Sequence, residues 1–186
     1  MNSRIRQITY SAIFIALIVG MGYALAFIPN IELVTALIFM AGVLMGLKAG
    51  LLIGAISELL FSVLNPIGSG LLFPPMLVAQ VCAMTIVGGV GGLCRSYVLK
   101  WRPQVINFIA LGALGVGLTL FYDICVSLAF PLSAGFNMQG LLATLVAGLV
   151  FSVIHVLANL AVFVLLVPVT AQRIYRAVPF FRLKEQ

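Results

Sequence analysis

The sequence has very few charged residues. Only 8% of its 186 residues are Asp, Glu, Lys or Arg, whereas 63% are hydrophobic, and the mean hydropathy is +1.26. A soluble domain carries about 25% charged residues, so a chain this apolar cannot cover a surface that faces water. The composition therefore excludes a soluble enzyme, a nucleic-acid-binding protein and a disordered adaptor, and it predicts an integral membrane protein.

Acidic residues are scarcer than basic ones. Ten Lys and Arg against four Asp and Glu give a formal net charge of +6. Nucleic-acid binding would require a clustered basic face beside a polar surface, whereas membrane proteins collect Lys and Arg in their cytoplasmic loops. We interpret the basic charge as a record of membrane topology and expect no nucleic-acid partner.

Catalytic and metal-ligating side chains are also rare. The three cysteines, Cys82, Cys94 and Cys125, form no CxxC pair, and the chain has a single histidine. Cysteines placed in apolar segments pack as small hydrophobic residues. No His/Cys cluster has metal-ligand spacing, and no serine has a neighbouring base in the sequence. We expect no enzymatic activity, no resident metal and no intrinsic cofactor.

Six apolar segments are predicted to be membrane helices, of which the second and third are shorter than the others. A span needs about 20 residues, so the chain accommodates six helices in a single membrane domain, residues 1–186, and leaves no room for a nucleotide-binding domain. The first apolar run is too long for a signal peptide and has no clear cleavage site. The predicted helices cover residues 8–28, 33–47, 49–64, 76–93, 105–130 and 138–167.

The connections between these segments differ in composition. The second and third segments form a hairpin that is predicted to turn at Lys48, and residues 65–75, rich in Pro and Gly, are predicted to be a structured loop. Every Lys and Arg falls at the N-terminus, at this turn, in residues 94–103 or in the C-terminal tail, whereas the alternate connections carry none. This asymmetry predicts that both termini are cytoplasmic.

Small residues form a stripe on the first predicted helix. Ala12, Ala16, Gly20 and Ala24 recur every four residues, so they share one face. Such a face lets another helix approach closely, and this neighbour is either another part of the chain or a partner protein.

Glycines recur in two further places. Four of them follow the same spacing through the predicted hairpin, where we expect them to let its two helices pack tightly; they are Gly42, Gly46, Gly50 and Gly54. A second group, near the inner end of the fourth predicted helix, would loosen or thin that helix; it comprises Gly88, Gly89, Gly91 and Gly92.

Polar residues inside the predicted spans are few and unevenly placed. An ionisable group in a membrane helix costs several kcal/mol unless it is paired or faces water, so it marks a functional position by default. Glu58 and Asp123 lie in the outer halves of their helices, while His155 and Asn159 lie four residues apart and share a face.

Two interpretations of these polar residues stay open. They fix the packing through hydrogen bonds between helices, or they line a cavity that opens outward. The two acids would attract a cationic or donor-rich ligand, pair with a cation or share a proton. The candidate binding residues are Glu32, Glu58, Phe73, Gln80, Tyr122, Asp123, Asn137, His155 and Asn159.

The order of these motifs resembles a known family. The first helix carries Ala12-xxx-Ala16, the second opens after Pro29-Asn30 with Val34-Thr35, the glycine-rich hairpin follows, and the loop at 65–70 precedes Pro74-Pro75-Met76. In this order, with six spans and both ends inside, the chain resembles the substrate-binding S components of energy-coupling factor (ECF) transporters, the micronutrient importers of bacteria and archaea.

The resemblance implies a function. It implies that Ala12, Ala16 and Gly20 dock on the coupling helices of a transmembrane T component, which joins two ATPases that use the ATP. A vitamin-like ligand would bind from outside and be released when the S component topples in the cytoplasmic membrane. The motifs are most like those of cobalamin-type S components, so a corrinoid is the first substrate candidate. Flat thiamine or flavin rings are less favoured, because Trp101 is placed on the cytoplasmic side.

A second function stays open. The chain would then be a solitary small transporter or channel that needs no ATPase module, with Glu58 and Asp123 as its transport groups. The chain has no internal repeat, although an alternating-access carrier normally shows two similar halves. Uptake by the purified protein alone would distinguish this alternative.

Overall fold

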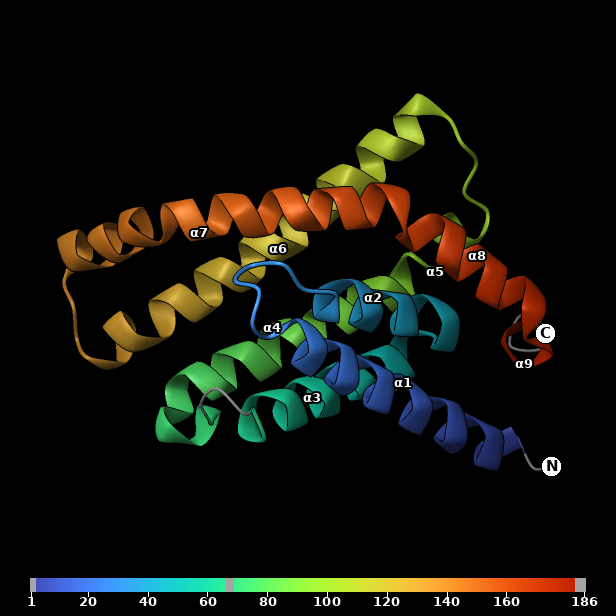
Figure 1. Ribbon diagram of the computed structural model, residues 1–186, viewed down its shortest axis with the longest axis horizontal. Helices are drawn as coiled ribbons and strands as arrows, with labels where there is room; N and C mark the ends of the chain where they lie inside the picture. The colour runs from blue at the N-terminus through green and yellow to red at the C-terminus, as the bar shows by residue number, and fades with distance from the viewer. Residues whose placement is uncertain (1–2, 66–68, 183–186) are drawn as a thin grey trace.

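The computed structural model describes residues 3–65 and 69–182, and these ranges are helical with no β-strand (Figure 1). Pro66, Ile67, Gly68 and Lys184, which belong to the predicted loop and basic tail, lie outside the described residues. The elements are α1 Ser3–Leu25, α2 Val34–Met45, α3 Leu47–Val63, the 3-10 turn η1 Gly70–Leu72, α4 Pro74–Leu93, α5 Arg95–Leu99, α6 Val105–Ser133, α7 Met138–Leu165, α8 Val167–Ala177 and α9 Pro179–Arg182.

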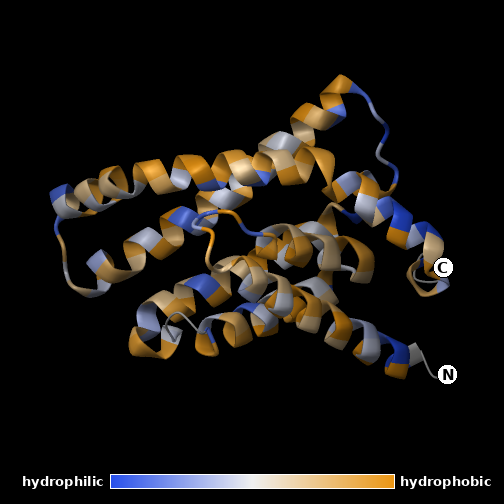
Figure 2. Ribbon diagram, in the orientation of Figure 1, coloured by the Kyte–Doolittle hydropathy of each residue, from blue (hydrophilic) through white to orange (hydrophobic). Residues whose placement is uncertain are grey.

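Four of the helices are long and apolar enough to cross a membrane: α1, α4, α6 and α7. Their outward faces carry large hydrophobic side chains, and Figure 2 shows hydrophobic colouring along most of their length. Val146 and Val150 on α7, for example, are 71% and 69% exposed. An apolar surface of this extent is stable in lipid and not in water. The prediction of an all-helical membrane protein is confirmed.

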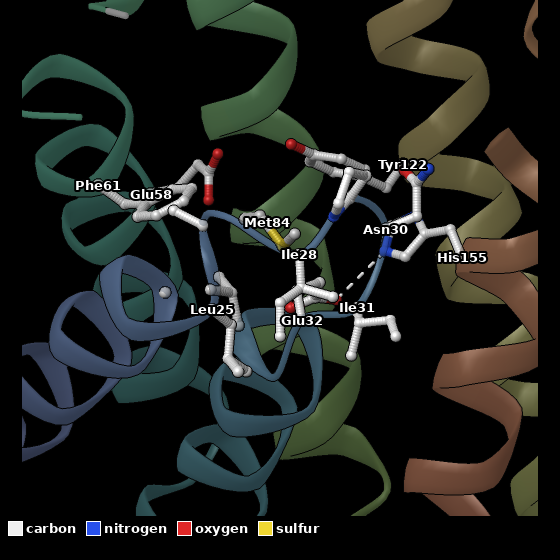
Figure 3. A pocket seen from close by; sticks show the side chains of 14 residues that line it. Leu25, Ile28, Asn30, Ile31, Glu32, Glu58, Phe61, Met84, Tyr122 and His155 are labelled. Atoms are coloured by element: carbon white, nitrogen blue, oxygen red, sulfur yellow. Dashed lines mark hydrogen bonds and ion pairs between the residues drawn. The ribbon is translucent and has the colours of Figure 1, made fainter. Parts of the chain in front are cut away.

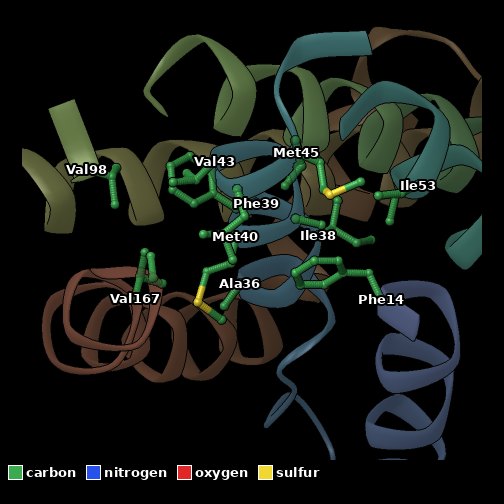
Figure 4. Close-up of a cluster of buried hydrophobic side chains, with 14 of the residues drawn as sticks. Phe14, Ala36, Ile38, Phe39, Met40, Val43, Met45, Ile53, Val98 and Val167 are labelled. Atoms are coloured by element: carbon green, nitrogen blue, oxygen red, sulfur yellow. The ribbon is translucent and has the colours of Figure 1, made fainter. Parts of the chain in front are cut away.

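The short helix α2 forms the centre of the bundle. Eleven of its 12 residues are buried, and it contacts α1, α3, α4, α7 and α8. Figure 4 shows its side chains pointing into a cluster that also contains Phe14 of α1 and Val167 of α8. The ring of Phe39 packs on that of Phe163 with centroids 5.2 Å apart. A helix that is hydrophobic on all sides is stable only when neighbours surround it, which explains the composition of α2.

Glycines bring α2, α3 and α4 into backbone contact. A Cβ atom on Gly42 would lie 2.7 Å from the backbone nitrogen of Gly92, and one on Gly88 would lie 2.7 Å from the carbonyl carbon of Gly50. Gly54 lies equally close to the backbone of Met84. The glycines near the C-terminal end of α4 therefore serve close packing and do not loosen this helix, although their sequence pattern had indicated that they would. We call this three-helix contact the glycine seam.

The hairpin turns at Gly46, two residues before the predicted position. Gly46 has φ +87°, a conformation that glycine adopts without steric cost. Lys48 consequently belongs to the first turn of α3.

Other helix ends also differ from the prediction. α1 covers residues 3–25 in place of 8–28, and α4 begins two residues early at Pro74, because proline fits the first helical turn. α6 continues through Pro131 to Ser133, whose hydroxyl donates to the carbonyl oxygens of Ala129 and Phe130. α7 ends at Leu165, two residues before the predicted end of its segment, and α5, α8 and α9 were not predicted.

The described basic residues lie at the starts of α1 and α3, in and just after α5, and in α8 and α9. Both chain termini lie at one end of the bundle (Figure 1). Arg95 of α5 donates to the carbonyl oxygens of Val43 and Leu44 at the end of α2, and to that of Phe181 in α9. Tyr10 of α1 stacks on Phe180 with ring centroids 4.8 Å apart. These contacts tie the start of α1, the end of α2, α5 and α9 together at one end, while the α3–α4 and α6–α7 connections lie at the other.

Candidate functional site

A cavity of about 270 Å³ lies between the segment that joins α1 to α2 and the helices α3, α4, α6 and α7 (Figure 3). Most of its wall is apolar, and its polar side chains come from four different parts of the chain. The residues that line it are Gly22, Leu25, Ala26, Ile28, Pro29, Asn30, Ile31, Glu32, Val34, Glu58, Phe61, Met84, Tyr122 and His155.

One wall holds a network of two carboxylates around the only histidine of the chain. The Nδ1 atom of His155 lies 2.7 Å from Oδ1 of Asp123, and its Nε2 atom lies 3.3 Å from Oε1 of Glu32. The side-chain amide of Asn159 donates to the same Glu32 oxygen over 2.9 Å. His155 is 6% exposed and Asn159 1%, so the network is buried; Oδ2 of Asp123 and Oδ1 of Asn159 have no hydrogen-bond partner among the described residues. The network joins α6, α7 and the segment before α2.

Glu32 is held at the N-terminus of α2. The backbone N–H of Thr35 donates to its Oε2 atom over 2.9 Å, which satisfies one of the free N–H groups of that helix end and places negative charge at its positive pole. Two residues earlier, Asn30 has φ +59°, a left-handed conformation in which Asn is several-fold enriched. This turn reverses the segment so that Glu32 points into the bundle.

The environment of Glu32 favours its ionised form. Burial alone would raise the pKa of this carboxyl, but the hydrogen bonds from His155, the Thr35 N–H and Asn159, together with the charge of His155, lower the pKa below its ordinary value of 4.5. Glu32 is therefore an anion that accepts hydrogen bonds from three groups.

The other polar wall is Glu58 of α3. This side chain is only 1% exposed. Its Oε1 atom accepts a hydrogen bond of 3.0 Å from the Ser62 hydroxyl, while Oε2 has no hydrogen-bond partner among the described residues. In Figure 3 the Glu58 carboxylate and the Tyr122 hydroxyl point toward one another across the cavity.

Tyr122 lies between the two walls. Gln80 of α4 donates to its hydroxyl over 3.4 Å, and its ring meets the imidazole of His155 edge-on, with centroids 6.2 Å apart. The phenol therefore contacts the histidine network on one side and faces Glu58 on the other.

The structure brings seven of the nine predicted binding residues together. Three of the four acidic residues of the chain lie at this cavity together with its only histidine, which contacts two of them. Four of the seven line the cavity directly, and Gln80, Asp123 and Asn159 hold the lining side chains in place. The same groups hydrogen-bond between helices and line a cavity.

The remaining two predicted residues lie outside the cavity. Phe73 packs against the ring of Phe130 at 5.6 Å, at the end of the bundle where α6 meets α7. Asn137 is exposed and accepts a hydrogen bond from the Gly140 N–H over 3.0 Å, which makes it the N-cap of α7. Both side chains stabilise that end of the bundle.

The sequence analysis did not single out the apolar lining. Gly22 leaves room for the ring of Phe61, whose nearest atom would lie 2.7 Å from a Cβ at that position. Leu25 and Met84 complete the wall around the polar groups. Only Asn30 carried a signal, because the Pro29-Asn30 pair predicts a turn.

The small-residue stripe of α1 faces outward. Ala12, Ala16, Gly20 and Ala24 are all exposed, and a Cβ added to Gly20 would meet no atom within 4 Å. Beside the stripe, a groove of about 460 Å³ runs between α1 and α3, and Ala12 lines it together with apolar residues such as Ile56. The described part of the chain therefore leaves this face without an internal partner.

Comparison of the chain with known protein families, with curated proteins and with solved structures gives no match. Within residues 3–65 and 69–182, no group of three or more His, Cys, Asp or Glu side chains is arranged to hold a metal ion. Fold and site together define a helical membrane protein with a buried, acid-lined cavity.

Proposed function

We propose that this protein is the substrate-binding S component of an ECF-type importer, which captures a micronutrient from outside and delivers it with the help of partner ATPases. The observation that carries the proposal is the cavity, where most of the buried ionisable side chains of the bundle converge. Ionisable side chains inside a membrane protein cost free energy, and several of them grouped around an open space are typical of a ligand site.

The orientation of the site is consistent with uptake. Several of residues 26–33 line the cavity, and this segment connects the ends of α1 and α2 that lie away from the N-terminal arginines and from Arg95. If the end that carries these arginines is cytoplasmic, as the positive-inside rule indicates, this segment covers the site on the outer side. In this proposal α2 and α3 complete a six-span bundle with both termini inside.

The free face of α1 supports docking on a partner. A stripe of small residues that no described part of the chain covers lets a foreign helix approach closely, and the adjoining groove adds apolar contact area. We assign Ala12, Ala16 and Gly20 to the contact with a T component. The protein would then topple to release its ligand, driven by ATP hydrolysis in the partner subunits.

The volume of the cavity favours a small ligand. Pockets for drug-sized molecules span about 300 to 1,000 Å³, and this cavity of about 270 Å³ is slightly smaller than that range. A single-ring micronutrient fits this space better than the corrinoid, which would require the segment at 26–33 to move away.

Substituting the stripe tests the docking role. The double substitution Ala12→Leu and Ala16→Leu should abolish partner-dependent uptake and complex formation. Ligand binding and thermal stability should stay at wild-type levels, because both positions are exposed. The matched control is Ala143→Leu with Ala147→Leu, an exposed pair at the same spacing on α7, and it should transport normally. Uptake that survives the α1 substitutions would contradict the assignment.

The solitary-transporter alternative is tested by measuring uptake with the purified protein in the absence of partner subunits. Purified protein in liposomes should bind ligand but show no uptake under the S-component proposal. Net uptake by the protein alone would favour the alternative, with Glu58 and Asp123 as transport groups.

A further inference from the structure

We infer that the ligand of this cavity is a small organic cation, such as a protonated amine or amidine, whose N–H donors bind the carboxylate of Glu58. The inference rests on the proposed function, because it assumes that the cavity holds a solute. It adds the chemical class of that solute, which neither the fold nor the resemblance provides.

Glu58 is a buried carboxylate with an unused acceptor. One oxygen accepts a hydrogen bond from Ser62 over 3.0 Å, while the other accepts none among the described residues. Burying a carboxylate without enough donors costs several kcal/mol, and a cation with N–H donors placed against it offsets much of that cost. The free oxygen belongs to a side chain that is 1% exposed and lines the cavity. It faces the Tyr122 hydroxyl across that cavity, so a ligand that occupies the space between them is placed to donate to it.

The opposite wall cannot supply the missing charge. His155 already contacts both Glu32 and Asp123, at 3.3 and 2.7 Å. Both ring nitrogens of His155 are therefore engaged, and neither is available to Glu58. No Lys or Arg is among the described residues that line the cavity. Carboxyl groups that line a partly open, mostly apolar cavity favour a cation over an anion.

The remaining walls match the body of an organic cation rather than a bare metal ion. Leu25, Phe61 and Met84 offer apolar surface close to Glu58, whereas a metal ion would need several converging ligands. The described side chains form no such group.

Three probes of one shape and different charge test the inference: benzamidine, which is a cation, benzamide, which is neutral, and benzoate, which is an anion. A panel of small metabolites, sorted into the same three charge classes, accompanies them. Binding is measured by calorimetry and thermal shift on the purified full-length protein in nanodiscs. The variants are Glu58→Gln, which removes only the charge, Glu58→Asp, which keeps it, and Thr144→Ala, a control on α7 remote from the cavity.

The inference predicts that the bound compounds are cations and that benzamidine binds more tightly than benzamide. Glu58→Gln should weaken cation binding about thirtyfold or more, as for loss of one partner in a buried charge pair, whereas Glu58→Asp should retain the preference for cations and Thr144→Ala should bind as the wild type does.

Two results would overturn it. Tight binding of neutral or anionic compounds, or cation binding that Glu58→Gln leaves unchanged, would refute the cationic ligand while the proposed binding function stands. If no compound of any charge binds and none is retained through purification, the binding function itself fails, and the inference fails with it.

Discussion

Gly88→Ala is expected to separate two helices that form the cavity. A Cβ at this position would lie 2.7 Å from the carbonyl carbon of Gly50 and closer still to its oxygen. Carbon atoms in contact lie about 3.5 to 4.0 Å apart, so α3 and α4 must separate by roughly 1 Å. The obstacle is backbone on a neighbouring helix, which cannot rotate away as a side chain does.

The magnitude follows from two opposing contributions. Forcing extra atoms into a packed interior costs about 1 to 3 kcal/mol, and a clash with backbone belongs at the upper end of that range. Alanine is the better helix former by about 1 kcal/mol, which leaves a net loss of about 2 kcal/mol. In a protein of this size 1 kcal/mol changes Tm by about 2–4 °C, so Tm should fall by about 4–8 °C.

Gly117→Ala is the matched control. Gly117 lies on the exposed face of α6, and a Cβ there would meet no atom within 4 Å, so Tm should stay constant or rise by a few degrees. Thermal unfolding in one detergent compares the two variants. If Gly88→Ala and Gly117→Ala have equal Tm values, the close backbone contact between α3 and α4 is wrong.

The remaining predictions concern the polar network. His155→Gln leaves two buried carboxylates without a cationic partner and should lower the stability by about 3 kcal/mol; an unchanged Tm would show that the network contributes nothing. The lowered pKa of Glu32 means that its stabilising contribution is complete above pH 4.5 and is lost as the pH falls toward the folded-state value; melting curves from pH 7 to pH 3 should show this loss in the wild type and not in Glu32→Gln. Tyr122→Phe removes the hydroxyl that Gln80 contacts and should weaken ligand binding with little change in Tm; calorimetry that finds wild-type affinity would exclude a role for this hydroxyl.

The membrane class and the convergence of the polar residues could be predicted from the sequence. Both depend on composition, because lipid-exposed surface must be apolar and an acid inside a span needs a partner. Glu58, Asp123 and His155 stand out for that reason, even though they lie far apart in the sequence.

The rotation of the helices could not be predicted. α6 and α7 are apolar on most faces, so no periodicity indicates which side points inward, and Phe73 and Asn137 looked as suitable as the residues that line the cavity. The role of Gly88 was equally hidden, since a glycine in a helix indicates either weakness or close contact until its neighbour is known. α8 differs, because its polar and basic residues lie on one face and its apolar residues on the other. This amphipathic pattern could have predicted the helix from the sequence.

Native mass spectrometry of the purified protein tests the central claim, that the cavity under residues 26–33 holds a solute. Wild-type protein should carry one small molecule or take one up from a metabolite panel. Ala26→Trp, which fills the cavity from its lining, should carry none, whereas Ala134→Trp at the exposed end of α6 should behave as the wild type does. Wild-type protein that binds nothing, or Ala26→Trp that binds as well as the wild type, would contradict the claim.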